Sequence, residues 1–224
     1  MNSTVKDLIK AEKKAELLFK EIERRDILIP GNSEEKINSM IFDLAFEMFG
    51  IKHYWHKRIV RCGENTLYPY NENPINLTLK DDDILFLDFG PIFEKWEADF
   101  GRTYVIGNDP YKIKLRKDIE KAWHEGSEYF KSKSKISGAE LYSFSQDLAI
   151  KYGWDFGGDI AGHIIGQYPH EKLEKEDKSN YIHPENQTDM YGLNKKGEKK
   201  NWILEMHFVD RQKKIGGFFE QLMA

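Results

Sequence analysis

Five acidic or imidazole side chains lie inside stretches of this sequence that are otherwise apolar or rich in glycine. They are Asp88, Asp99, His163, Glu205 and Glu220, in the runs LFLDFG, WEADFG, AGHIIG, WILEMHF and GGFFEQL. Burying a carboxylate in such surroundings is very unfavourable unless a group of opposite charge pairs with it. The only lysine or arginine close beside them is Arg102, three residues after Asp99. Taken singly, Asp88 or Asp99 could be a structural carboxylate in a turn, but five such residues suggest a common partner.

A pair of divalent cations would neutralise this set of side chains. Four carboxylates balance two doubly charged ions, and one neutral imidazole adds a nitrogen ligand, so the whole group can be buried. Oxygen ligands with a single nitrogen suit manganese, cobalt, iron or zinc as divalent ions. Two such ions about 3.5–4 Å apart would lower the pKa of a water molecule between them to about 7. These residues therefore predict a centre of two divalent metal ions (Mn, Co, Fe or Zn) that supplies a nucleophile at neutral pH.

Two further histidines form an H-x-x-H pair, His53 and His56, which on a helix could bind zinc. The surrounding residues 52–61 alternate as in a strand, where positions three apart face opposite sides of a sheet. We therefore do not expect this pair to hold a metal ion. Taken alone, His56 is a candidate for the substrate pocket. His207 is another, because on a strand it shares a face with Glu205, two residues earlier.

Hydrophobic periodicity and turn residues predict the elements that would position these side chains. We expect helices over 4–25, 32–50, 110–131 and 138–152, and strands over 52–61, 83–90, 96–107, 201–210 and 215–222. Capping-box sequences begin the second and fourth helices, at Asn32 and Ser137. The runs 83–90 and 96–107 should form an antiparallel hairpin that brings Asp88 and Asp99 onto one face. The polar residues 172–200 read as a surface loop.

This alternation of helices with antiparallel hairpins predicts an α+β fold. We expect a single domain over residues 1–224, with the helices of residues 1–50 packed on it. Of the 224 residues 40% are hydrophobic, enough for a sizeable core, and the net charge of −4 gives no electrostatic case for nucleic acid or an anionic membrane as partner. Cys62 is the only cysteine, which excludes an intrachain disulfide and suits a reducing cytosol. The N-terminal residues have no uninterrupted apolar stretch, so we expect a soluble cytoplasmic protein.

The order of the five residues resembles that in the pita-bread metallopeptidases, which include methionine aminopeptidases, Xaa-Pro aminopeptidases and prolidases, with creatinase as a metal-free relative. The segment DFGPIFEKWEADFGRTYVIG is similar to the prolidase-type hairpin, GHIIGQYPHE to the family's GHGIG and HE motifs, and GENTLYPY to its substrate-side loop. The similarity covers residues 33–224. It implies a pita-bread fold, in which helices flank a curved antiparallel sheet. It also implies a dinuclear metal-dependent hydrolase that cleaves a peptide or related amide C–N bond.

The resemblance also implies a role for each residue that matches a family motif. Asp88, Asp99, His163, Glu205 and Glu220 would be the metal ligands, and Glu205 would also accept a proton from the attacking water. His170 matches the histidine that contacts the substrate and stabilises the tetrahedral intermediate. The resemblance further suggests a homodimer.

Three positions depart from the family pattern, and all would alter the substrate pocket. Pro69-Tyr70 replaces a proline-histidine pair; Tyr70 can donate a hydrogen bond to an oxyanion but is a poor base at neutral pH. Phe218 stands where prolidase-like enzymes have an arginine, and Met206 where the family usually has a proline. We therefore predict an aminopeptidase or dipeptidase type of enzyme with a changed pocket and a small peptide or amide substrate. Two alternatives stay open: a non-catalytic metal-binding protein of the same fold, and an enzyme acting on a non-peptide small molecule.

Overall fold

The computed structural model describes residues 3–169, 177–194 and 197–224. Within these residues, the helices are α1 (Ser3–Arg24), α2 (Glu34–Phe49), α3 (Pro110–Ser132) and α4 (Gly138–Tyr152). The longer strands are β1 (Ile59–Cys62), β2 (Asp83–Phe89), β5 (Phe100–Ile106), β8 (Asn201–Asp210) and β9 (Ile215–Leu222). Short pieces are β3 (Ile92–Phe93), β4 (Trp96–Glu97), β6 (Asp155–Phe156), β7 (Ile164–Ile165), and the 3-10 turns Gly63–Leu67 and Lys178–Asn180.

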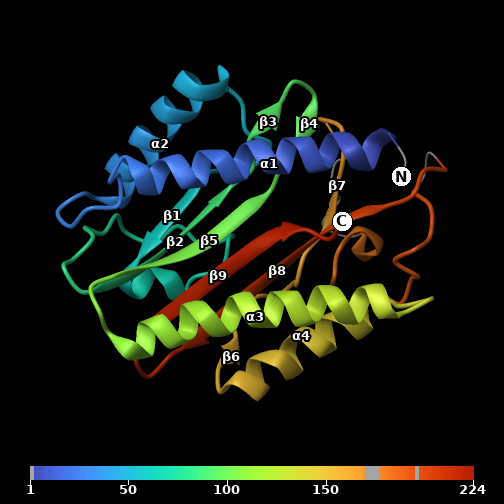
Figure 1. The fold of residues 1–224 in the computed structure, drawn as a ribbon. Coiled ribbons are helices and arrows are strands. Elements are labelled where there is room, and N and C mark those ends of the chain that lie inside the picture. The colour runs from blue at the N-terminus through green and yellow to red at the C-terminus, as the bar shows by residue number, and fades with distance from the viewer. Residues whose placement is uncertain (1–2, 170–176, 195–196) are drawn as a thin grey trace.

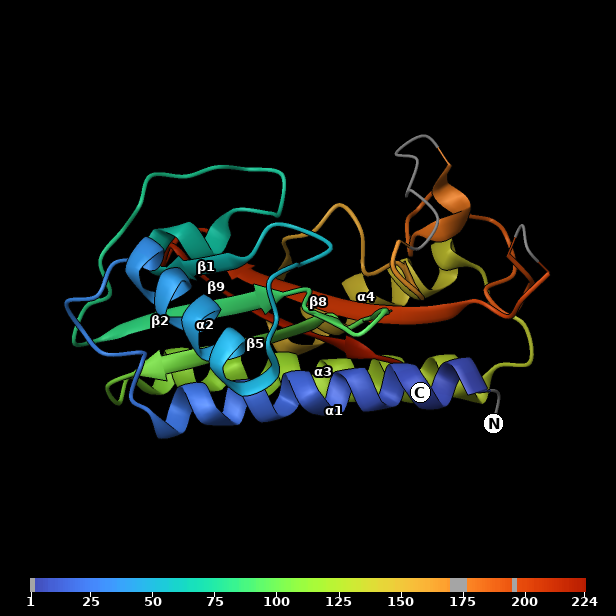
Figure 2. The same cartoon turned by 90° about the horizontal axis from the view of Figure 1, so that it is seen from above.

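The strands form one antiparallel sheet in the order β1-β2-β5-β9-β8-β6, with β7 paired to β8 and a separate ribbon of β3 and β4. Helices α1 and α3 run across one face of this sheet (Figure 1). Seen from above, the long connection between β1 and β2 and the chain that follows α4 lie over the opposite face (Figure 2). The sheet therefore has a helical side and a side covered by loops.

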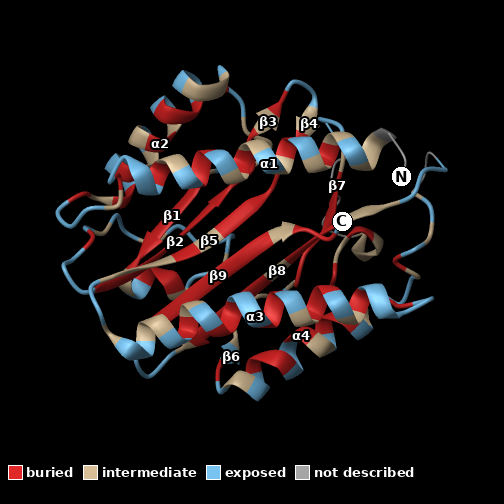
Figure 3. Ribbon diagram, viewed as in Figure 1, coloured by how far each residue is buried: buried red, intermediate tan, exposed pale blue. Residues whose placement is uncertain are grey.

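The two faces of the sheet differ because side chains alternate along each strand. On β2, Leu85, Leu87 and Phe89 are fully buried in a core with α1 and α2, while Asp88 points to the loop-covered side. On β8, Leu204 and Met206 pack with α3 and α4. Figure 3 shows the buried residues of the long helices on the stripe that faces the sheet. The helical side thus holds the core, and the polar side chains of the same strands are left for the other side.

Most of the predicted elements are confirmed. The hairpin of β2 and β5 is present, although its second strand begins at Phe100 because residues 96–97 belong to β4. The helix expected over 32–50 begins after Ser33, whose hydroxyl accepts from the amide of Lys36, so the cap predicted at Asn32 is wrong by one residue. No helix in the described part of the chain has both the length and the apolar character needed to cross a membrane.

The strand predicted over 52–61 is wrong in its first half, since β1 begins only at Ile59. The preceding residues turn toward the β2–β5 hairpin instead. The amide of Trp55 donates to the carbonyl of Gly90, and its indole N–H donates to the carbonyl of Ala98, at 3.0 Å each. These long-range hydrogen bonds replace those of a regular strand. In the loop predicted over 172–200, the described residues include a 3-10 turn and isolated bridges, such as that of His163 with Tyr181.

Candidate metal centre

Three of the predicted ligands lie in one row across the loop-covered side of the sheet. Asp88 on β2 is paired with Gly101 on β5, Gly101 with Glu220 on β9, and Glu220 with Glu205 on β8. Directly paired residues project from the same side of a sheet with their Cβ atoms about 4.5–5.5 Å apart. Because Gly101 has no side chain, the ring of Phe218 packs over it, and a Cβ there would lie 2.6 Å from that ring and 3.0 Å from Cβ of Glu220. The register of four strands therefore gathers residues that are far apart in sequence.

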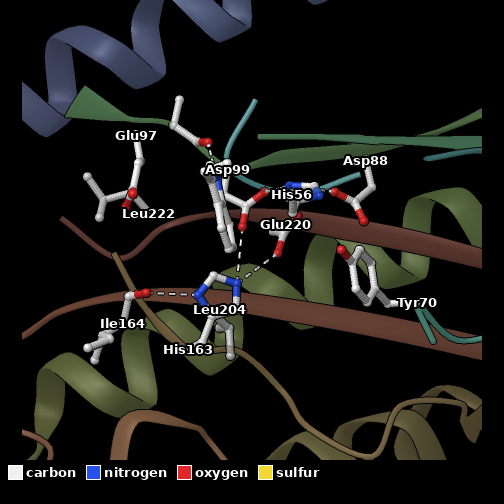
Figure 4. Close-up of polar contacts among 12 residues, drawn as sticks. His56, Tyr70, Asp88, Glu97, Asp99, His163, Ile164, Leu204, Glu220 and Leu222 are labelled. Atoms are coloured by element: carbon white, nitrogen blue, oxygen red, sulfur yellow. Dashed lines mark hydrogen bonds and ion pairs between the residues drawn. The ribbon is translucent and has the colours of Figure 1, made fainter. Parts of the chain in front are cut away.

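Asp99 lies just before β5, is 1% exposed, and contacts two imidazoles. Its Oδ2 is 3.1 Å from Nε2 of His163, and its Oδ1 is 3.0 Å from Nε2 of His56. The same nitrogen of His56 lies 3.5 Å from Oδ1 of Asp88, and that of His163 lies 4.0 Å from Oε1 of Glu220. Figure 4 shows these five side chains turned toward one another. Asp99 thus stands between two clusters of ligand atoms.

His163 is held close to β8 by the glycine before it. Gly162 has φ of 135°, and a Cβ there would lie 2.1 Å from the carbonyl oxygen of Ile203. Only glycine tolerates this conformation and this close approach. The backbone carbonyl of His163 then accepts from the amide of Ile203, and its Nδ1 donates to the carbonyl of Ile164 at 2.9 Å. These contacts leave Nε2 directed at Asp99.

The donor atoms form two groups that share one carboxylate. Ligand atoms of His56, Asp88 and Asp99 lie within 4.8 Å of one another, and so do those of Asp99, His163 and Glu220. Two of the carboxylate atoms, Oδ1 of Asp88 and Oε2 of Glu220, are buried without a hydrogen-bond partner in the described part of the chain. Buried polar atoms are normally satisfied, so each is explained by a cation that it would bind. The residues present fit the binding of divalent metal ions, and Asp99 is common to both groups of donor atoms.

The electrostatics of the centre also favour bound positive charge. Burial raises the pKa of Asp88 to about 7 and that of Glu205 to about 8, and it raises the pKa of Glu220 well above its usual range. Burial acts in the same direction on Asp99, but the charge of His56 and hydrogen bonds from both histidines lower its pKa to about 2. Carboxylates crowded in a dry site compete for protons or cations. Divalent ions would satisfy all of them together.

The structure brings the five predicted ligands into one region, with one difference among them. Glu205 is half-buried and belongs to neither compact group of donor atoms, although it is paired with Glu220 and faces the same cavity. His170 lies outside the described residues. Of the H-x-x-H pair, His53 is exposed, while His56 reaches the carboxylates.

A cavity of about 660 Å³ opens beside the row of carboxylates and includes the three predicted pocket residues Tyr70, His56 and His207. Tyr70 is 45% exposed at its rim, and its hydroxyl accepts from the amide of Lys57 at 3.3 Å. His207 is buried in the floor, where Nε2 donates to the carbonyl of Thr66 at 2.8 Å. Burial lowers the pKa of His207 to about 4, so this ring is neutral near pH 7.

Phe218 forms an apolar part of the cavity wall. It lies two residues before Glu220 on β9, so both side chains project from the same side of the sheet. Its ring packs 5.3 Å from that of Phe86 and 6.1 Å from that of His207, measured between centroids. This departure from prolidase-like enzymes therefore places an aromatic cluster in the cavity wall. The expectation that Met206 alters the pocket is wrong, because its side chain is buried with α3 and α4 on the helical side of the sheet.

Sequence reasoning missed how close His56 comes to the carboxylates, and it missed Arg61, which lines the same cavity. Arg61 is 3% exposed and donates to the carbonyls of Tyr68, Pro69 and Glu72, so it fixes the loop that carries Tyr70. A signal was present in both cases. A charged or imidazole side chain beside apolar residues occurs in HYWH and in IVRC, as it does at the five predicted ligands.

Comparison with known proteins agrees with this arrangement. A model of metallopeptidase family M24 matches residues 6–195, which is more than half of the sequence. The chain belongs to this metallopeptidase family. It is 26% identical over 170 residues to a Mycoplasma pneumoniae protein whose name places it among the Xaa-Pro aminopeptidases, and the match covers 74% of this chain and 47% of that protein. The chain thus spans about half the length of the curated relatives that it matches.

Solved structures show the same fold. A dipeptidase from Mycobacterium ulcerans superposes with a TM-score of 0.77 at 18% identity, over 99% of this chain and 55% of the other. A methionine aminopeptidase from Thermotoga maritima gives 0.67 at 15% identity, over 100% of this chain and 97% of the other. The prediction of an α+β pita-bread fold from the sequence is confirmed.

Proposed function

We propose that this chain is a dinuclear metal-dependent hydrolase that cleaves a peptide or related amide C–N bond in a small substrate. The observation that carries the proposal is the pair of donor groups that share Asp99, one with Asp88 and the other with His163 and Glu220. Membership of a metallopeptidase family supports hydrolysis as the reaction. Manganese, cobalt, iron and zinc all suit this mixture of oxygen and nitrogen ligands.

The proposed ions would be held by Asp88, Asp99, His163, Glu205 and Glu220. When bound, two divalent ions lower the pKa of water toward neutrality and polarise a substrate carbonyl. Glu205 faces the cavity and would accept the proton that the attacking water loses. His170, by its place in the sequence motif, would donate a hydrogen bond to the oxygen that becomes negative during attack.

Tyr70 is suited to binding the substrate as a hydrogen-bond donor. Burial raises the pKa of its phenol, so the hydroxyl keeps its proton at neutral pH. Its oxygen accepts from the amide of Lys57, which leaves the O–H free to donate into the cavity. Tyr70 would therefore orient a substrate carbonyl rather than act as a base.

Phe218 and Phe86 make the neighbouring wall apolar, and this wall bears on which substrate is taken. A free carboxylate next to two aromatic rings would lose hydration without gaining a partner. We therefore propose that the group bound against Phe218 is apolar and uncharged, which differs from what an arginine at this position would select. The proposal does not require proline in the substrate.

A screen of metal-loaded protein tests this function. The protein, freed of metal and then reloaded in turn with manganese, cobalt, iron and zinc, is incubated with Xaa-Pro dipeptides, other dipeptides and N-blocked amides. Hydrolysis with at least one ion is expected, and Asp88→Asn serves as the matched blank. Two bound ions with no turnover of any peptide or amide would favour a non-catalytic protein or one that acts on a non-peptide molecule. The predicted homodimer and single domain remain predictions.

A further inference from the structure

We propose that His56 is an additional ligand of the centre and binds the ion held by Asp88 and Asp99. Each of the two ions would then have one imidazole, from His56 and His163 respectively. This inference rests on the proposed metal centre. It also extends it, because His56 comes from a segment that none of the five predicted ligands occupies.

The two histidines are oriented in the same way. Nδ1 of His56 lies 2.7 Å from the carbonyl oxygen of Lys57, and Nδ1 of His163 lies 2.9 Å from that of Ile164, in each case the next residue. Their Nε2 atoms approach opposite oxygens of Asp99, at 3.0 and 3.1 Å. A histidine that binds a metal usually donates its other N–H to a carbonyl or carboxylate, which fixes the orientation of the ring. His56 therefore has the arrangement of a ligand, matched atom by atom by His163.

The surroundings of Nε2 point to a shared cation. A carbonyl oxygen can only accept, so Nδ1 of His56 carries a proton, and in the neutral ring Nε2 presents a lone pair. That lone pair faces Oδ1 of Asp99 and, at 3.5 Å, Oδ1 of Asp88, the buried atom without a hydrogen-bond partner among the described residues. Nε2 and the two carboxylate oxygens converge in a dry site, where either a proton on Nε2 or a metal ion bound by all three atoms can hold them together. A divalent ion satisfies all three at once.

The position of His56 is built into the fold. The hydrogen bonds of Trp55 to Gly90 and Ala98 attach this segment to the turn between Asp88 and Asp99. Space for the ring exists because residue 90 is glycine. A Cβ there would lie 2.2 Å from Cδ2 of His56 and 2.4 Å from its Nε2. The ring of His56 thus packs directly against the backbone at Gly90, which holds the ring in place as a metal ligand requires.

A second nitrogen has a chemical consequence for the choice of metal. Imidazole raises affinity for cobalt and zinc relative to manganese, which prefers an all-oxygen environment. The site with His56, Asp88 and Asp99 should therefore bind cobalt more tightly, relative to manganese, than the same site without the imidazole.

Metal binding, rather than turnover, tests the inference. Wild type, His56→Ala and His56→Gln are stripped of metal. Cobalt affinity is then measured by competition with a chromophoric chelator, together with the visible absorption of bound cobalt. We expect two ions in wild type, and in both variants a loss of at least about 10-fold in the affinity of one site with a changed spectrum, since outer-sphere partners alone are worth 10–100-fold. His53→Ala, an exposed histidine three residues away, is the matched control and should bind as wild type does.

The outcomes separate this inference from the proposed function. Unchanged cobalt affinity and spectrum in both His56 variants would overturn it, and a fall in turnover alone would assign His56 to the substrate. Asp99→Asn should weaken both sites; if it leaves metal binding intact, the dinuclear centre itself is wrong. Nitrogen-15 NMR of wild type provides a measurement that no folding defect can obscure. Zinc should shift Nε2 of two histidines, and a shift of one only would refute the inference.

Discussion

Asp88→Asn should make the metal-free protein more stable. It should also reduce the stability that the protein gains when metal ions are added. Asp88 is 7% exposed, and burial raises its pKa from 3.8 to about 7. A carboxyl with a raised pKa stabilises the fold in its protonated form, and this contribution is complete below pH 3.8 and lost as the pH rises through 7. At 1.36 kcal/mol per pKa unit, ionisation of Asp88 lowers the free energy of unfolding of the wild type, relative to its value at low pH, by about 2 kcal/mol at pH 5 and about 4 kcal/mol at pH 8. The neutral amide avoids this loss.

Bound metal ions should favour the wild type over Asp88→Asn. An ion present at 100 times its dissociation constant stabilises the folded state by about 2.7 kcal/mol, so two ions supply about 5 kcal/mol. Asp88→Asn removes a ligand from one site and should keep no more than about half of that gain. For a chain of this size, 1 kcal/mol corresponds to roughly 2–4 °C in melting temperature. The variant should therefore melt above wild type in a chelator at pH 8, and its gain on metal addition should be smaller by about 5–10 °C.

Circular dichroism melts at pH 5 and pH 8, with chelator and with excess manganese, test this pair of opposite effects. The exposed carboxylate Asp43 provides the control, because Asp43→Asn should change stability by less than about 0.5 kcal/mol under every condition. Suppose that Asp88→Asn melts below wild type in the chelator at pH 8 and that manganese raises its melting temperature as much as that of wild type. The charge of Asp88 then does not destabilise the metal-free fold, and Asp88 is not a ligand.

Three further changes probe the same design. Gly90→Ala should displace the ring of His56, because the new Cβ would lie 2.2 Å from Cδ2, and should weaken cobalt binding at one site as His56→Ala does; full affinity would mean that the ring moves freely. Glu12 is a partly buried residue of α1 whose pKa is raised by burial from 4.5 to about 7, so Glu12→Gln should match wild type at pH 4.5 and exceed its stability by up to about 3 kcal/mol at pH 8 in denaturant titrations. A difference that does not change with pH would contradict this. Phe218→Arg should lower the KM for dipeptides with a free carboxylate by about 10–100-fold, the value of a charge-assisted hydrogen bond, whereas Phe218→Leu should not; equal KM values in both variants would remove Phe218 from the substrate site.

The residues of the candidate centre could be predicted because each breaks a local pattern. An acidic residue among Leu, Phe and Ile conflicts with burial unless it has a partner, and this conflict is visible without a structure. The hairpin that brings Asp88 toward Asp99 is also local, since only residues 90–99, with the short β3–β4 ribbon, separate its strands. By contrast, the row from Asp88 to Glu205 depends on the pairing of β5 with β9 and of β9 with β8. Strand order of this kind is set by non-local packing, and the sequence alone predicted only that the residues meet.

The place of His56 could not be predicted for a different reason. Alternation in residues 52–61 indicated a strand, and a strand would have turned His53 and His56 to opposite sides. The structure follows that pattern only from Ile59 onward, because the amide and the indole N–H of Trp55 donate to carbonyls in the connection between β2 and β5. Long-range hydrogen bonds from the backbone and the side chain of one residue therefore override a local periodicity. Gly90 leaves space for the ring of His56, but its position in the sequence does not indicate which side chain will occupy that space.

Tyr70, which departs from the family pattern, lies beside His56 in the structure. Tyr70 takes the place of a histidine in the substrate loop, and its ring lies 5.8 Å from that of His56, nearly perpendicular to it. The amide of Lys57, the residue after His56, donates to the hydroxyl of Tyr70, so a hydrogen bond links the two segments. An imidazole is therefore still present on this side of the carboxylates, but it enters from the segment before β1 and faces Asp88 and Asp99. Under the proposed function, Tyr70 would bind the substrate at the rim of the cavity, while His56 faces Asp88 and Asp99.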